Sequence, residues 1–141
     1  MFSDALKVKA LLFSFVGYLV ASVVATGIVV QAWLPAGVTD PQELSRLAEA
    51  DAHLLLWQII LGTALGIVAG FAACQFSGAA GLKNSLVLGL LFLPYAVLGI
   101  YMHPSHPLLM QASKLVAPIP LSLLGGWLRL AVSRSTVASH A

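Results

Sequence analysis

Four long apolar runs constrain the fold of this chain more than any other feature of its sequence. Each has the roughly 18 to 20 residues that a helix needs to cross a hydrocarbon core of about 30 Å. Lipid offers no hydrogen-bond partner to a bare backbone, so each run is expected to be a helix. The sequence therefore predicts an all-α integral membrane protein, a four-helix bundle with transmembrane helices over about residues 10–34, 53–76, 85–102 and 107–132.

The composition supports a membrane protein with a single domain. Of the 141 residues, 60% are hydrophobic and 9% are charged, against roughly 25% charged residues in soluble domains. A soluble fold of this length cannot bury so much apolar surface. We therefore expect one domain, residues 1–141, embedded in the lipid bilayer. The net charge of +2 is small and the basic residues are scattered, which argues against a nucleic-acid partner.

The positions of the basic residues predict the orientation of the bundle. In a four-span arrangement, five of them fall on one side of the membrane: Lys7, Lys9, Lys83, Arg129 and Arg134. Arg46 and Lys114 fall on the other side. Because short loops rich in Lys and Arg stay in the cytoplasm, we expect both termini to be cytoplasmic in a bacterial inner (plasma) membrane. The loop between the first two spans then faces outward.

This outward loop carries a helix-start signal. In "TDPQE", Thr39 or Asp40 suits the N-cap and Pro41 suits the first helical position. We expect a loop helix over about residues 41–52 that continues without a break into the second span, so that this helix starts outside the membrane. Its polar side chains are the candidate contacts to a partner: Glu43, Arg46, Glu49 and Asp51.

Small residues on the first two spans predict close helix packing. The second span repeats glycine at every fourth position, which lets a neighbouring backbone approach closely. The first span offers a matching face of small residues. The candidate packing residues are Gly62, Gly66 and Gly70 on the second span and Gly17, Ala21 and Ala25 on the first. The spacing does not distinguish packing within one chain from packing between two copies.

Prolines interrupt the third and fourth runs. Pro94 lies in the third run, and Pro118 and Pro120 lie in the fourth. Each proline removes one helix hydrogen bond and tilts the helix axis. The fourth helix is therefore expected to be either kinked or broken.

Acidic residues are missing from the apolar runs. No Asp or Glu occurs between Asp4 and Asp40, and none follows Asp51. Proton-coupled carriers depend on an acid inside the membrane, di-iron bundles need several, and hydrolytic triads need an orienting acid. The single cysteine, Cys74, also excludes an internal disulfide or a redox cysteine pair. The sequence therefore predicts no catalytic residues, and we expect a protein that is not an enzyme.

Three histidines are predicted to lie at the outer face of the bundle. His53 begins the second span, and "YMHPSHP" places His103 and His106 between the third and fourth spans. Imidazoles from different helices can ligate haem iron or copper, so these residues are candidate metal or haem ligands. The simpler interpretation is a turn, because Pro104 and Pro107 hold the preceding residues extended between two helices. We expect the turn and no cofactor, with haem or copper as the alternative.

Three functions fit this sequence. The first is a non-catalytic protein that acts through helix-helix contacts with another membrane protein, as a small subunit, assembly factor or immunity-type protein. The second is a homo-oligomeric channel or carrier for a small solute, assembled through the glycines of the second span. The third is a haem- or copper-binding membrane subunit that uses the outer-face histidines. The small-residue faces and the missing intramembrane acid favour the first function.

Overall fold

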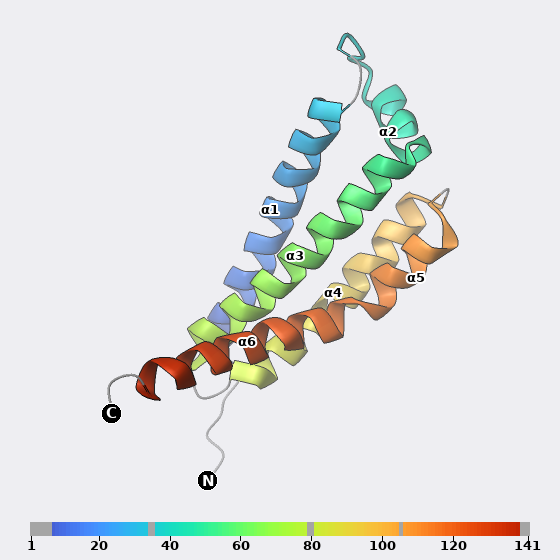
Figure 1. Ribbon diagram of the computed structural model, residues 1–141. Helices are drawn as coiled ribbons and strands as arrows, with labels where there is room; N and C mark the ends of the chain where they lie inside the picture. The colour runs from blue at the N-terminus through green and yellow to red at the C-terminus, as the bar shows by residue number, and fades with distance from the viewer. Residues whose placement is uncertain (1–6, 34–35, 79–80, 105, 139–141) are drawn as a thin grey trace.

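The computed structural model describes residues 7–33, 36–78, 81–104 and 106–138, and this part of the chain is almost entirely helical (Figure 1). Its helices are α1 (Val8–Trp33), α2 (Pro41–Ala50), α3 (Ala52–Ser77), α4 (Gly81–Met102), α5 (Leu108–Val116) and α6 (Pro118–Ala138). Three of them, α1, α3 and α4, are long and apolar enough to cross a membrane. The bent pair α5–α6 is a fourth candidate if it is counted as one span. The prediction of a helical chain is confirmed for the described residues, with three to four helices long and apolar enough to cross a membrane.

The expected unbroken helix from the loop into the second span is wrong. Helix α2 ends at Ala50, and α3 begins at Ala52. Asp51 lies between them in an extended conformation, and its carboxylate accepts hydrogen bonds from the backbone N–H groups of His53 (2.8 Å) and Leu54 (3.1 Å). Aspartate is among the best N-cap residues, so Asp51 starts a new helix instead of continuing the old one.

The start of α2 agrees with the sequence. Asp40 is the N-cap, and its side chain accepts a hydrogen bond from the N–H of Gln42 at 3.1 Å. Pro41 is the first helical residue, where its missing N–H removes no helix bond.

The fourth apolar run is broken into two helices. Helices α5 and α6 are bent by 47° at Ala117, directly before Pro118. Proline has no N–H for the preceding turn and its ring clashes there, whereas it fits the first turn of a new helix. Pro107 is the N-cap residue of α5, without a side-chain hydrogen bond, and the helix begins at Leu108. In contrast, Pro94 lies inside α4 without ending it.

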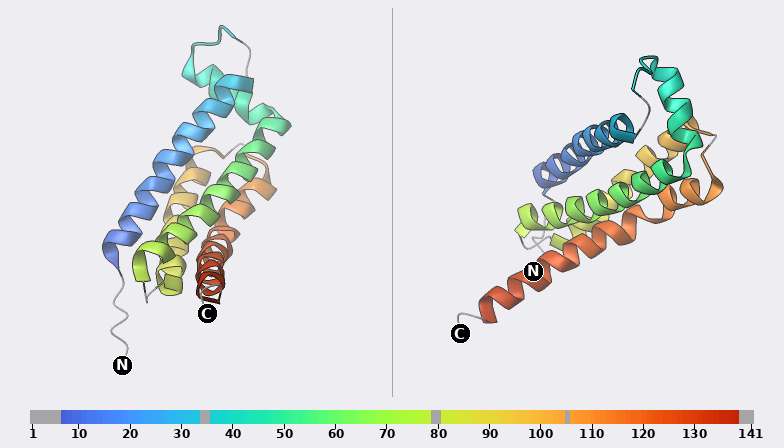
Figure 2. Two further views of the ribbon diagram at one scale, coloured as in Figure 1. Left: turned by 60° about the vertical axis from the view of Figure 1, so that its left-hand side comes forward. Right: turned by 45° about the horizontal axis from the view of Figure 1, so that its top comes forward.

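Helices α3, α4 and α6 form the tight core of the bundle, and α1 packs on the other side of α3 (Figure 2). Cβ atoms added to Gly125 and Gly89 would lie closer than 3.0 Å to the backbone of α3 and of α6 respectively, so these helices meet at backbone contact. Leu88 and Phe92 of α4 are buried in the centre. The ring of Tyr18 on α1 lies 4.3 Å from that of Phe92, which attaches α1 to the core.

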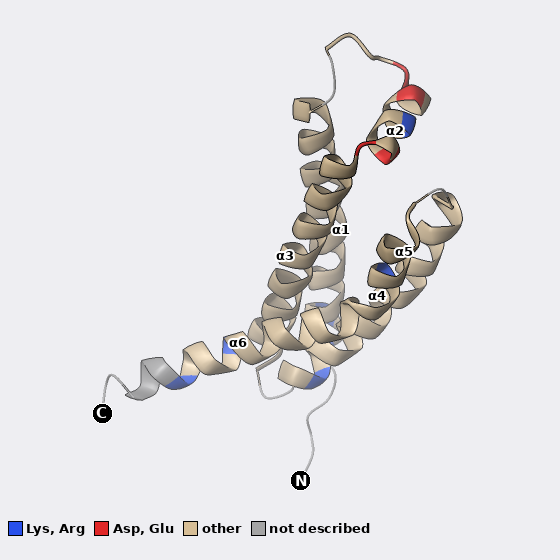
Figure 3. Cartoon of the chain, turned by 45° about the vertical axis from the view of Figure 1, so that its right-hand side comes forward, with Lys and Arg blue, Asp and Glu red and all other residues tan. Residues whose placement is uncertain are grey.

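Charged residues gather at the two ends of the bundle (Figure 3). The acidic residues that the structure describes all lie in α2 or cap its ends. Most basic residues lie at the opposite end, at the start of α1, in the first turn of α4 and in the second half of α6, whereas Arg46 lies in α2 and Lys114 in α5. The middle of the bundle is therefore almost free of charge, as a membrane-crossing segment requires.

Candidate functional site

A cavity of about 480 Å³ opens among α1, α3, α4, α5 and α6, toward the end that carries α2. This volume falls within the range of roughly 300–1,000 Å³ that is usual for small-molecule sites. Its lining is apolar except for a set of hydrogen-bonding side chains and a cationic one. The polar lining residues are Tyr18, Ser22, Thr26, Gln58, Thr63, Tyr95, His103, His106, Ser113 and Lys114.

Small residues and the proline break create this space. Gly62 on α3 and Gly99 on α4 both line the cavity, and a Cβ atom at either would meet nothing within 4 Å. The break between α5 and α6 also faces the cavity, because Ala117 and Pro118 line it. The 47° bend therefore sets the direction in which α5 leaves the core and helps to leave the cavity unfilled.

At the α2 end, the cavity meets a cluster of Glu49, His103 and His106. Each of these residues offers one ligand atom, and the three atoms lie within 4.8 Å of one another. His103 Nδ1 lies 2.8 Å from Glu49 Oε1, and His106 Nε2 lies 3.9 Å from the same oxygen. The two imidazole rings are stacked, with centroids 5.1 Å apart and planes 13° from parallel. One residue from α2 is thereby joined to two from the α4–α5 connection.

The backbone of this connection is held by hydrogen bonds that the sequence does not reveal. The side-chain amide of Gln111 on α5 donates to the carbonyl oxygens of Pro104 (3.1 Å) and His106 (2.8 Å). The N–H of His106 donates to the carbonyl of His103 at 3.3 Å. The turn predicted for this stretch therefore also presents both histidines to the cavity.

Lys114 completes the cluster. Its Nζ lies 2.8 Å from His106 Nδ1, and because an ammonium group only donates, that nitrogen must be the acceptor. His106 is 8% exposed, whereas His103 is partly exposed. Burial and then the positive charge of Lys114 lower the pKa of His106, against an opposing effect of Glu49. Both effects favour the neutral form of the imidazole.

The remaining predicted site residues lie apart from this cluster. His53 is not part of it; its ring lies 6.3 Å from the ring of Trp33. Asp51 accepts a hydrogen bond of 3.1 Å from the Trp33 indole, in addition to capping α3. Glu43 and Arg46 lie exposed on α2. The corner at Asp51 explains the separation, because it turns α2 away from the axis of α3 and carries Glu49 toward the α4–α5 connection.

The candidate packing glycines of α3 lie in two different environments. Gly66 and Gly70 are buried against α6: a Cβ at Gly70 would lie closer than 3.0 Å to the backbone of Ser122, and one at Gly66 would lie 3.5 Å from Leu121 Cβ. Gly66 also lines the cavity, as does Gly62, where an added Cβ would meet nothing within 4 Å. The helix that packs on Gly66 and Gly70 is therefore α6 of the same chain.

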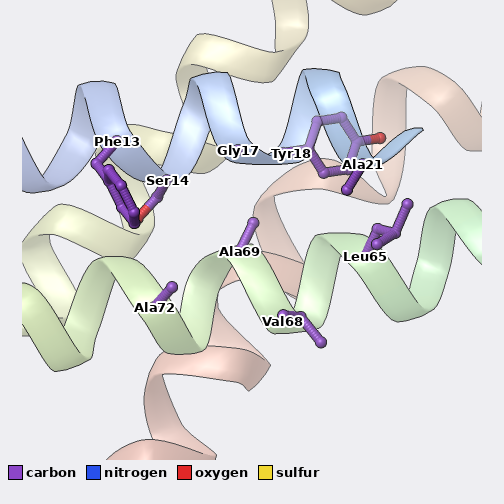
Figure 4. Close-up of a pocket in the computed structure, with 9 residues that line it drawn as sticks. All are labelled: Phe13, Ser14, Gly17, Tyr18, Ala21, Leu65, Val68, Ala69 and Ala72. Carbon is purple, nitrogen blue, oxygen red and sulfur yellow. The ribbon is translucent and has the colours of Figure 1, made fainter. Parts of the chain in front are cut away.

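The small-residue face of α1 borders a second, smaller cavity of about 150 Å³ between α1 and α3 (Figure 4). Gly17 and Ala21 line it from α1, and Ala69 and Ala72 line it from α3. Ala25, farther along α1, is half-buried. Small residues on both helices leave this seam loosely filled, in contrast to the backbone contact between α3 and α6.

Comparison with protein-family models, with curated proteins and with solved structures finds no match for this chain. The site itself must therefore carry any statement about function.

Proposed function

We propose that this protein is a non-catalytic, multi-pass membrane protein that binds a small solute in the cavity among α1, α3, α4, α5 and α6 and acts as its carrier or binding subunit. The observation that carries the proposal is the cavity itself, which holds hydrogen-bonding groups among long helices that expose mainly apolar side chains between their charged ends. Interiors of this kind are usually filled by side chains at close-packed density. A cavity of about 480 Å³ is large enough for a metabolite-sized molecule.

The lining indicates the chemistry of the solute. Serine and threonine hydroxyls can satisfy themselves on their own helix backbone, but the amide of Gln58 has more donors and acceptors than such a bond uses. The lining residues include Lys114 and no carboxylate. A neutral or anionic molecule that forms several hydrogen bonds therefore suits the cavity better than a cation.

The solute site proposed here differs from the homo-oligomeric channel or carrier that the sequence suggested. That oligomer would assemble through the glycines of the second span, but Gly66 and Gly70 are covered by α6 within one chain. A single chain supplies all the lining residues of the solute site proposed here. An oligomer would have to form through other faces.

Accessibility of engineered cysteines tests the proposal. In a Cys74→Ser background, Thr63→Cys places a thiol in the cavity, whereas Ile60→Cys places one on the exposed face of α3. In membranes, a water-soluble methanethiosulfonate should modify the cavity thiol and leave the lipid-facing thiol unmodified. Equal protection of both thiols would contradict a solvated cavity.

A second variant connects access with binding. Gly62→Trp adds a bulky side chain at a lining position where nothing lies within 4 Å of a Cβ. It should slow modification of Thr63→Cys. It should also abolish binding of any small molecule that mass spectrometry detects in the purified wild-type protein. An unchanged bound molecule in Gly62→Trp would place that molecule outside the cavity.

Helix α1 supports a second candidate, the small subunit that acts through helix-helix contacts. Among the described residues of α1, only Ala10, Leu11 and Ser14 are buried. Gly27 is exposed and a Cβ atom there would meet nothing within 4 Å, so a partner helix has room to approach at this position. Capture of the chain in mild detergent should then recover one stoichiometric membrane protein, and Gly27→Leu should release it. Recovery of the chain alone would remove this candidate.

A further inference from the structure

We propose that Glu49, His103 and His106 form a binding site for a divalent transition-metal ion, with Zn²⁺ as the best match. Two imidazoles and one carboxylate are a ligand set that zinc accepts with an open fourth position. The proposal differs from the ligand set considered from the sequence, because Glu49 takes the place of His53. It does not depend on the solute proposed for the cavity.

The distances are close to those of a bound site. Ligand atoms about 2.0 to 2.1 Å from a tetrahedral zinc ion lie roughly 3.4 Å from one another. The Glu49 oxygen lies 2.8 Å from His103 Nδ1 and 3.9 Å from His106 Nε2, and the three ligand atoms are mutually within 4.8 Å. Binding a common ion would require side-chain rotations that bring these separations to about 3.4 Å.

The backbone that carries the two histidines is already fixed. Gln111 holds the carbonyls of Pro104 and His106, so the stacked rings are presented by a braced turn. Two imidazoles with centroids 5.1 Å apart repel each other when both are protonated, but a metal ion uses both in their neutral form.

Lys114 has a specific part in this site. Its ammonium group donates to His106 Nδ1, which leaves the ring proton of neutral His106 on Nε2, facing Glu49. A metal ion needs the lone pair of Nε2, so the proton must move to Nδ1 and Lys114 must withdraw. The lysine is thus a resident cation that competes with the metal.

An ion here would connect α2 to the α4–α5 connection at the end of the cavity. His103 and His106 both line the cavity, so a fourth coordination position is available from that side for water or for an anionic group of a bound molecule. The metal would therefore fix the α2 end of the bundle and add a positive charge to the cavity.

Calorimetric titration of the full chain with Zn²⁺ in detergent, near neutral pH, tests the site. Wild-type protein should bind one equivalent, and His103→Ala or His106→Ala should weaken binding by at least about tenfold, since loss of a supporting group alone costs about 10- to 100-fold. His53→Ala is the matched control, because it removes a histidine at the same end that lies outside the cluster. Equal loss in His53→Ala, or no binding by wild type, would overturn the proposal.

Two further measurements keep the test independent of folding defects. Co²⁺ bound to wild-type protein should give the intense visible bands of four-coordinate nitrogen and oxygen ligation; a weak six-coordinate spectrum would overturn the site. Lys114→Gln should tighten Zn²⁺ binding, because the amide oxygen can accept the Nδ1 proton of a metal-bound His106. If Lys114→Gln weakened Zn²⁺ binding as severely as His106→Ala, Lys114 would not compete with the metal. The cluster would then be explained by the Lys114–His106 hydrogen bond, and the proposed site would be overturned.

Discussion

The hydroxyl of Ser85 on α4 donates a 2.9 Å hydrogen bond to the backbone carbonyl of Gly70 on α3. A Cβ atom at Gly70 would lie closer than 3.0 Å to the backbone of Ser122 on α6, and Gly126 of α6 lies against the Ser85 side chain. Three helices therefore meet at backbone distance around one hydroxyl. In lipid, where apolar side chains gain little by leaving the solvent, such close contact supplies most of the attraction between helices.

Removal of the hydroxyl should have a small, measurable effect. Ser85→Ala loses the 2.9 Å bond to Gly70 and the longer 3.2 Å one to Gly81 of its own helix. It should lower the free energy of unfolding by about 0.6 kcal/mol, the average for hydrogen bonds between membrane helices. Ser133→Ala is the control, because that hydroxyl donates to Leu130 of its own helix. Denaturant titration in mixed micelles measures both. An equal loss of stability in Ser133→Ala and Ser85→Ala would show that the hydrogen bond from Ser85 to Gly70 stabilises the bundle no more than a bond within one helix.

Bulk at Gly70 should be far more harmful than bulk at Gly62. A side chain at Gly70 collides with the backbone of Ser122, so Gly70→Leu should cost about 3 kcal/mol, the upper end for overpacked cores, or prevent folding. Gly62→Leu enters open cavity and should leave the thermal midpoint nearly unchanged. Gly125→Ala is a milder probe of the same interface and should still destabilise. Equal tolerance at positions 62 and 70 would mean that α6 does not pack on α3 as described.

Asp51 should control the corner between α2 and α3. Asp51→Ala removes the N-cap of α3 and the bond from the Trp33 indole, so it should lower the thermal midpoint and speed hydrogen exchange at the first amides of α3. Asp51→Asn is the matched control, because asparagine also caps helices well. It should therefore retain most of the protection. Identical behaviour of the two variants would assign the effect to lost charge.

The same residue predicts a pH dependence. Hydrogen bonding from the N–H of Leu54, aided by Trp33 and His53, holds the pKa of Asp51 below its ordinary value of 3.8. A lowered carboxyl pKa contributes stability that is fully present above the unfolded value and is lost as the pH falls through the folded one. Wild-type protein should thus lose stability relative to Asp51→Asn as the pH falls below about 4. Parallel pH profiles of the two proteins would contradict this.

The sequence was sufficient to predict where the helices lie, but not which helices pack against one another. Apolar runs of about 20 residues determine where helices form in lipid, and the Asp40–Pro41 cap showed where α2 begins. Asp51 before an apolar run was an equally good N-cap signal. It explains why the chain breaks between α2 and α3, where a continuous helix was predicted. Glycines of α3 predicted close packing, but small residues occur on several spans. Their pairing with α6 follows from the tertiary arrangement alone.

The histidine cluster shows the same limit. His103 and His106 were recognisable because they lie three positions apart and each is followed by a proline, whereas Glu49 is 54 positions away from His103. Glu49 reaches the two histidines because α2 ends at the corner formed by Asp51, whereas His53 follows that corner and lies on α3, outside the cluster. Lys114 could be matched to His106 only once α5 was known to start at Leu108 and to lie beside the turn.

The orientation in the membrane remains a prediction that the charge distribution supports. The described acidic residues lie at the α2 end and most of the basic ones at the other end, so the positive-inside rule places the α2 end outside. Ser45→Cys on α2 should react with an impermeant thiol reagent added to intact cells, and Lys83→Cys at the start of α4 should react only after the membrane is opened. The wild-type chain controls for the buried Cys74. The reverse labelling pattern would invert the bundle, placing the Glu49–His103–His106 cluster and the cavity end beside it in the cytoplasm, where free zinc is scarcer and a different solute pool is available.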